Sequence, residues 1–104
     1  MEFSHRVLQA DLMRVSVRVF GDLVATIGRK HTIELDQGAT VATLANRIAE
    51  KAGLRRGGYL GNHEVGGEDL AILVNGRNIR LIKGVETLLY DGDEVVILPP
   101  TAGG

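Results

Sequence analysis

The residues best suited to chemistry stand at the end of the chain, where Pro99-Pro100 is followed two residues later by Gly103-Gly104. Proline lacks a backbone donor and has a fixed φ, so the proline pair stops a strand and projects the following residues in an extended form. Glycine has no side chain, so Gly103 and Gly104 can enter a channel that is too narrow for other residues. The sequence therefore predicts a tail that carries the carboxylate of Gly104 to a distant active site.

That carboxylate is inert until it is activated. Its transfer to the α-phosphate of ATP makes an acyl-adenylate, and sulfide, a thiol or an amine can then attack the carbonyl carbon. Glycine suits this reaction because it has no β-carbon to hinder the attack and no stereocentre to scramble. The chain itself would be the substrate, with ATP consumed by a partner enzyme and no cofactor bound to the chain.

Other residue patterns give no case for an active site within the chain. His63 precedes a glutamate, but Gly67 occupies the position at which a zinc-binding His-Glu-x-x-His motif has its second histidine. Asp91, Asp93 and Glu94 could form a metal cluster, although acids at such positions more often form turns and begin strands. The other histidines are scattered and accompany no nucleophile. We expect no catalytic residue, no metal site and no enzyme activity.

The composition is that of one small domain of 104 residues. Hydrophobic residues make up 44% of the chain and aromatic residues only 4%, so the core must consist mainly of Val, Leu and Ile. A net charge of −1 gives no electrostatic case for binding nucleic acid or an anionic membrane. The lack of cysteine excludes disulfides and thiolate metal sites. With no membrane-length apolar run and no secretory signal, a cytoplasmic location is expected.

Two alternating segments predict the first two strands. Residues 13–20 alternate apolar and polar side chains, the pattern of a half-buried strand, and residues 31–35 repeat it. The glycine-bracketed connection at 21–28 is interpreted as a loop, with Phe20 and Leu23 closing the end of the core.

One helix is predicted to begin behind Thr40, whose hydroxyl can accept a hydrogen bond from an amide of the first turn. The apolar residues that follow have the spacing of one helical face: Val41, Leu44, Ala45, Ile48 and Ala52. Gly53 suits the left-handed position that ends a helix.

The second half of the chain predicts a long loop and three strands. Residues 53–69 contain six glycines and few apolar residues, which indicates a mobile loop. Short strands are expected at 70–75 and 79–81, separated by a tight turn at 75–78. The last strand, 94–98, is apolar at four consecutive positions. Such a run is typical of a strand in the centre of a sheet that is covered on both faces.

The element order β-β-α-β-β-β predicts an α+β domain in which a mixed sheet packs on one main helix. If the last strand lies beside the first, the helix covers one face of the sheet and leaves part of the other face open. Val96 and Leu98 point toward this open part. Together with Phe20 they form a predicted partner-binding patch, because an uncovered apolar surface commonly marks a binding site.

We expect residues 13–100 to form the folded domain and residues 101–104 to form a flexible tail. Residues 1–12 show no sustained period, so they are predicted to be a poorly ordered extension. A short surface helix over residues 7–12 is the alternative for this segment.

Several of these motifs together resemble the ubiquitin-like sulfur carriers, which include MoaD (the small subunit of molybdopterin synthase), the thiamine carrier ThiS and the small archaeal modifier proteins. The shared features cover residues 13–104 and are Phe20-x-x-Leu23, Gly38-x-Thr40-Val41-x-x-Leu44, Val74-Asn75-Gly76, Asp91-Gly-Asp-Glu-Val95 and Pro99-Pro100-x-x-Gly103-Gly104. The resemblance implies a β-grasp, or ubiquitin-like, fold with a flexible C-terminal tail.

The resemblance further implies that an E1-like adenylyltransferase, similar to MoeB or ThiF, activates Gly104. The tail then becomes a thiocarboxylate for sulfur transfer in molybdopterin (molybdenum cofactor) biosynthesis, and the chain could serve as the non-catalytic small subunit beside the large subunit of molybdopterin synthase. The length of segment 53–69 favours the molybdopterin and modifier branches over the thiamine carriers. Thr101-Ala102 departs from the Val-Ser often found before the diglycine, which leaves the downstream partner open.

Two other functions are compatible with the same sequence. Ligation of Gly104 to lysines of target proteins would make the chain a ubiquitin-like protein modifier, and the tail alone does not separate this function from sulfur transfer. The third interpretation is a passive β-grasp binding module in which the tail has no role. Removal of Gly103 and Gly104 would leave the function of such a module intact.

Overall fold

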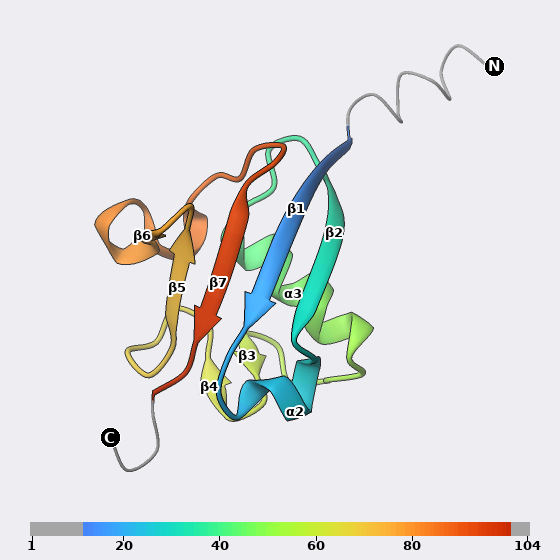
Figure 1. The fold of residues 1–104 in the computed structure, drawn as a ribbon, viewed down its shortest axis with the longest axis vertical. Coiled ribbons are helices and arrows are strands. Elements are labelled where there is room, and N and C mark those ends of the chain that lie inside the picture. Colours follow the sequence, from blue (N-terminus) through green and yellow to red (C-terminus); the bar gives the residue numbers. More distant parts are fainter. Residues whose placement is uncertain (1–11, 101–104) are drawn as a thin grey trace, which may run out of the picture.

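The structure, a computed structural model, describes residues 12–100 of the chain and consists of a five-stranded mixed sheet with one main helix across one face (Figure 1). The strands lie in the order β2-β1-β7-β5-β6. Their bounds are β1 (Leu12–Val19), β2 (Lys30–Asp36), β5 (Ala71–Val74), β6 (Arg77–Asn78) and β7 (Glu94–Leu98). This is the α+β arrangement of a mixed sheet on one main helix that the element order predicts, and it is the β-grasp architecture that the resemblance implies.

Strands β1 and β2 form the antiparallel hairpin that their alternating residues predict, with Val15 opposite Ile33 in the register. Every second residue of β1, from Met13 to Val19, is buried, whereas the residues between them are exposed. The connection was predicted as a loop, but it contains the short helix α2 (Leu23–Ile27). The first and last residues of helix α2, Leu23 and Ile27, are both buried in the core, and this tertiary contact stabilises the helix. The glycines on either side of the segment led to the prediction of a loop.

Helix α3 (Val41–Lys51) covers the inner face of the sheet, as predicted. The Thr40 hydroxyl accepts a hydrogen bond from the amide of Thr43 at 3.3 Å and so caps the first turn. The buried residues of helix α3 are Val41, Leu44, Ala45, Ile48 and Ala49. The last position of the predicted face, Ala52, lies beyond the helix and is exposed.

Strand β7 lies in the centre of the sheet, parallel to β1 and antiparallel to β5, which confirms its predicted position. Val95 and Ile97 are buried against the inner layer, but Val96 is half-buried and Leu98 is 36% exposed. The interpretation of its apolar run as covered on both faces is therefore wrong. A single helix covers only the inner face, so the outward residues remain accessible to a partner.

The edge of the sheet differs from the sequence prediction. Asn75 and Gly76 both have positive φ and form a two-residue turn between β5 and β6. The strand predicted at 79–81 is instead a 3₁₀ helix, η1 (Ile79–Leu81), and a second one, η2 (Gly84–Glu86), follows. Two contacts favour the helical turn, because Ile79 is buried and the Asn78 side chain accepts a hydrogen bond from the amide of Arg80.

The glycine-rich segment 53–69, predicted as a mobile loop, contains a small hairpin of strands β3 (Tyr59–Leu60) and β4 (His63–Glu64). Leu60 is completely buried. A side chain at Gly66 would lie 2.8 Å from Cγ1 of Val85, so glycine is needed there for close packing on the η2 segment. The glycines of this segment therefore permit close contacts in addition to loop formation.

The predicted N-terminal extension lies almost wholly outside the described residues. Leu12, its last residue, already belongs to β1 and is opposite Asp36. Within residues 12–100, no helix is long and apolar enough to span a membrane.

The burial of Leu60 predicts that the glycine-rich hairpin contributes to the core. Leu60→Ala should lower the free energy of unfolding by about 2–5 kcal/mol, because it removes a fully buried side chain. The matched control is Leu81→Ala, at a residue 71% exposed, and it should change stability by about 0.5 kcal/mol or less. Urea unfolding measures both values. Equal effects of the two substitutions would contradict the contribution of the hairpin to the core.

Candidate functional site

The candidate site is the point where the C-terminal strand β7 leaves the sheet. Leu98 is partly exposed, Pro99 is half-buried and Pro100 is exposed. The chain thus passes from the centre of the sheet to the surface within three residues. The predicted activation site, Gly103 and Gly104, lies outside the described residues, so its position remains a prediction.

The exit of the tail is held against the end of β1. The amide of Phe20 donates a hydrogen bond to the carbonyl oxygen of Ile97 at 3.1 Å, two residues before Pro99. The next residue, Gly21, has a φ of 69°, and a Cβ built on it would lie 2.8 Å from Cγ of Pro99. The Pro99 ring therefore occupies the space that a side chain at Gly21 would need. Sequence reasoning identified Pro99 but not the glycine against which it packs.

Helix α2 fixes the position of Gly21. The amide of Val24 donates to the Gly21 carbonyl, and Leu23 anchors the helix in the core with 2% exposure. The glycine-rich hairpin supports the same helix, because a Cβ at Gly61 would lie 3.4 Å from Cδ2 of Leu23. His63 in β4 also contacts the start of the helix, with its Nε2 atom 3.4 Å from Oδ2 of Asp22. The hairpin thus supports the exit of the tail through α2.

Hydrogen bonds fix the opposite end of β7 in register. The Asp93 carboxylate accepts hydrogen bonds from the side-chain amide of Asn75 at 3.0 Å and from the backbone amide of Tyr90 at 2.8 Å. The Asn75 side-chain oxygen in turn accepts from the amide of Glu94 at 2.9 Å. Residues 12–100 contain no cluster of acidic and histidine side chains that could hold a metal ion. The acids of this turn have the structural role that their positions predict.

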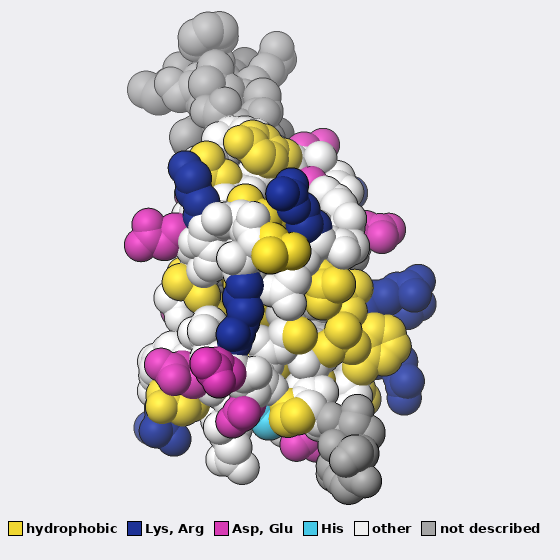
Figure 2. Space-filling model, turned by 90° about the vertical axis from the view of Figure 1, so that its left-hand side faces the viewer, with side chains coloured by type: hydrophobic (Ala, Val, Ile, Leu, Met, Phe, Trp, Pro, Cys, Tyr) yellow, Lys and Arg dark blue, Asp and Glu magenta, His cyan; other side chains and the backbone are white. Residues whose placement is uncertain are grey.

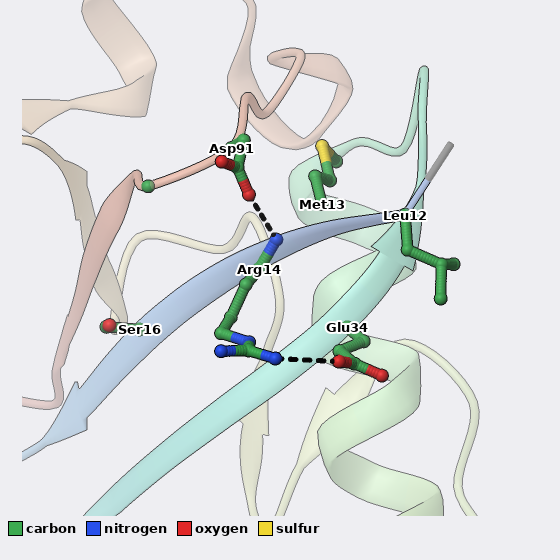
Figure 3. A pocket seen from close by; sticks show the side chains of 7 residues that line it. Leu12, Met13, Arg14, Ser16, Glu34 and Asp91 are labelled. Atoms are coloured by element: carbon green, nitrogen blue, oxygen red, sulfur yellow. Dashed lines mark hydrogen bonds and ion pairs between the residues drawn. The ribbon is translucent and has the colours of Figure 1, made fainter. Parts of the chain in front are cut away.

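A shallow pocket of about 550 Å³ lies beside this turn, at the end of the sheet where β1 begins (Figure 3). Its charged side chains, Arg14, Glu34 and Asp91, already have partners within the chain. Asp91 accepts a hydrogen bond from the amide of Arg14 at 2.8 Å, and the guanidinium of Arg14 contacts Glu34 at 3.1 Å, as Figure 3 shows. These contacts hold the turn on β1, and the pocket is no better a candidate site than the exit of the tail.

The predicted partner-binding residues lie together on the outer face of the sheet. Phe20 is 45% exposed, and in the sheet register Val96 is opposite Leu73 and Leu98 is opposite Ala71. Leu73 is half-buried and was missed from the sequence, although its alternate position in an apolar strand is a usable signal. Figure 2 shows hydrophobic side chains gathered on the side of the molecule formed by this face, at the right of the view. We call Phe20, Leu73, Val96 and Leu98 the outer patch.

The contact between Gly21 and Pro99 can be tested by a substitution that fills it. Gly21→Val should lower the free energy of unfolding by about 1–3 kcal/mol more than Gly38→Val. Both glycines have positive φ, but nothing lies within 4 Å of a Cβ at Gly38, so the difference between them isolates the Pro99 contact. Thermal or urea unfolding of the two variants supplies the comparison. Equal losses would mean that Pro99 does not pack against Gly21 in solution.

Two curated relatives are similar in sequence to this chain. The small archaeal modifier protein 3 of Haloferax volcanii is 34% identical over 94 residues, which cover 88% of this chain and all of that protein. A candidate sulfur carrier protein of Archaeoglobus fulgidus is 54% identical over 35 residues, which cover 34% of this chain and 40% of that protein. Among solved structures, a candidate molybdopterin converting factor, subunit 1, of Pyrococcus furiosus superposes with a TM-score of 0.67 at 30% identity. That superposition covers 86% of this chain and 99% of the other.

The sequence pattern of the ThiS family matches residues 17–104, which include the whole of the tail exit and the outer patch. Proteins of this family are non-catalytic carriers and modifiers that pair with E1-like activating enzymes, in agreement with the predicted lack of enzyme activity. Because the family match and the Haloferax relative both span most of the chain, this protein belongs to the ThiS/MoaD family of ubiquitin-like sulfur carriers and has their β-grasp fold.

Proposed function

We propose that this chain is a sulfur carrier whose Gly104 carboxylate is adenylated by an E1-like enzyme of the MoeB or ThiF type and converted to a thiocarboxylate. The acceptor of the sulfur is a molybdopterin precursor, with the chain acting beside the large subunit of molybdopterin synthase. The reaction runs in the cytoplasm, where the activating enzyme draws on ATP. The similarity to the Pyrococcus converting factor supports this branch of the family.

The observation that carries the proposal is the combination of a rigid exit with the diglycine sequence. Strand β7 is paired on both sides up to its last residues, and Pro99 packs at Gly21 immediately afterwards. Any partner that docks on the sheet therefore meets the tail at a defined starting point. The five residues after Pro99 end in Gly103-Gly104, which suit a narrow channel because they lack side chains.

The proposed reaction takes place in two steps on the carbonyl group of Gly104. A carboxylate oxygen attacks the α-phosphorus of ATP, the bond to the β-phosphate oxygen breaks, and pyrophosphate leaves. Hydrosulfide then attacks the carbonyl carbon of the acyl-adenylate, and AMP leaves with the electron pair of the carbon–oxygen bond. The thiocarboxylic acid so formed loses its sulfur-bound proton to solvent to give the thiocarboxylate, and no residue of the chain changes its oxidation state. The chain contributes the reacting carboxylate and its positioning.

The outer patch is the proposed docking surface for the activating enzyme. Its residues are apolar, lie on one face and adjoin the exit of the tail, since Leu98 directly precedes Pro99. Contiguous apolar residues that stay exposed on a folded domain are candidates for a partner contact. Docking there would leave the tail free to reach the ATP site of the enzyme.

Sulfur transfer predicts a change of mass at the C-terminus. After incubation with the activating enzyme, ATP and a sulfide donor, the intact mass should rise by the difference between one sulfur and one oxygen atom. Deletion of Gly103 and Gly104 should abolish the change and leave the thermal midpoint of unfolding unaltered, since both lie beyond the paired strand. An unchanged wild-type mass under these conditions would rule out the carrier. Full biological activity of the deleted chain would instead favour a passive binding module.

A second function, protein modification, is favoured by the full-length similarity to the Haloferax modifier protein. In that case a lysine amine of a target protein attacks the same acyl-adenylate, AMP leaves and an isopeptide bond forms. Proteolysis of cellular proteins should then release lysines that carry a remnant of the Gly103-Gly104 end, which mass spectrometry detects. Their absence in cells that contain the wild-type chain, with a chain lacking the diglycine as the negative control, would exclude this function.

A further inference from the structure

Two cations face each other on the outer face of the sheet, next to the outer patch. Arg18 in β1 is directly opposite Lys30 in β2, and both are exposed. Arg18 occupies an outward position of β1, because the residues before and after it, Val17 and Val19, are buried. Like charges directly opposite each other on neighbouring strands destabilise a sheet. The folded chain alone therefore gains nothing from this pair.

The carboxylates of the described residues do not neutralise this pair. The ion pairs within residues 12–100 are Arg14 with Glu34 and His63 with Asp22. Arg14 lies on the same face as Arg18, two outward positions earlier in β1, and has its partner on the neighbouring strand at 3.1 Å. Among residues 12–100, Arg14 thus has a carboxylate partner at one end of the outer face, whereas Arg18 and Lys30, at the end where β7 leaves the sheet, have none.

The sheet register places the two cations beside the proposed docking surface. Arg18 is opposite Lys30 on one side and opposite Val96 of the outer patch on the other. Phe20, the next outward residue of the same chain segment, belongs to the patch as well. Strand β2 is the edge of the sheet, so Lys30 is accessible from the side. An apolar surface bordered by two exposed cations is complementary to an apolar surface bordered by a carboxylate.

We propose that Arg18 and Lys30 receive an aspartate or glutamate carboxylate of the activating enzyme when that enzyme docks on the outer patch. This inference rests on the proposed function and adds the charge of the partner surface. The net charge of −1 and the isolation of the two cations match a single carboxylate better than a nucleic acid backbone, which requires an extended basic surface. The carboxylate relieves the repulsion between the cations, so it strengthens association and fixes the orientation of docking.

Arg18 and Lys30 are expected to lower the stability of the free chain and to strengthen its association with the enzyme. The two effects can be measured separately, so the proposal is testable. Arg18→Gln and Lys30→Gln each remove one charge and should leave the thermal midpoint unchanged or raise it, because the repulsion is relieved. Both should weaken association with the enzyme. The control is Arg55→Gln, which removes one charge from an exposed residue in the segment after α3. A purely structural role of the cations cannot raise stability and weaken association at once.

The experiment measures ATP–pyrophosphate exchange by a purified MoeB-type or ThiF-type enzyme at several concentrations of the full-length chain. We expect KM for the chain to rise roughly threefold to fivefold in each of the two variants, with kcat unchanged because the tail is intact. KM of the wild type should rise with salt, and this dependence should be weaker in the two variants. The Arg55→Gln control should retain the wild-type KM and salt dependence.

The outcomes separate the two proposals. A wild-type chain that the enzyme does not activate overturns the proposed function, and the cationic contact fails with it. A wild-type chain that is activated, with Arg18→Gln and Lys30→Gln indistinguishable from Arg55→Gln, overturns the cationic contact alone. A fall in kcat at unchanged KM would overturn it as well, because it would assign the two cations to the chemical step.

Discussion

The structure depends on the pairing of the last strand, β7, with the first strand, β1, in the centre of the sheet. Backbone hydrogen bonds join the two strands at both ends, from Ser16 to the carbonyl of Asp93 and from Phe20 to that of Ile97. Strand β5 pairs with the other edge of β7. A C-terminal strand with two neighbours cannot fray without breaking the sheet, so the residues that follow it start from a fixed point. This constraint suits a chain whose working group is proposed to be its terminal carboxylate.

The remaining architecture follows from having one main helix for a five-stranded sheet. Helix α3 buries the inner face, and the outer face keeps an apolar patch together with its charged neighbours. A small protein cannot easily cover both faces, because its surface is large relative to its volume. The uncovered face is then available for a partner. The outer patch adjoins the tail exit, since Leu98 directly precedes Pro99.

Local signals in the sequence predicted most of the elements correctly. The alternation along β1, the cap at Thr40 and the apolar face of α3 each depend on residues within a few positions of one another. The predictions that were wrong concern segments whose structure is decided by contacts with residues far away in the sequence. Segment 53–69 has the composition of a loop, but Leu60 is buried and adjacent glycines allow close packing. Residues 79–81 have the polarity of a strand, but the buried Ile79 and the Asn78 cap favour a 3₁₀ turn.

The sequence by itself determined the helix, the hairpin strands, the acidic turn before β7 and the chemistry available to a Pro-Pro-x-x-Gly-Gly tail. Only the tertiary structure decided that Pro99 packs at Gly21, that Leu73 joins the outer patch and that Arg18 lies opposite Lys30. The physical reason is the range of the interactions. Side-chain periodicity, caps and turns act over a few residues, whereas strand register brings together groups that are far apart in the chain and are specified only when the whole core packs.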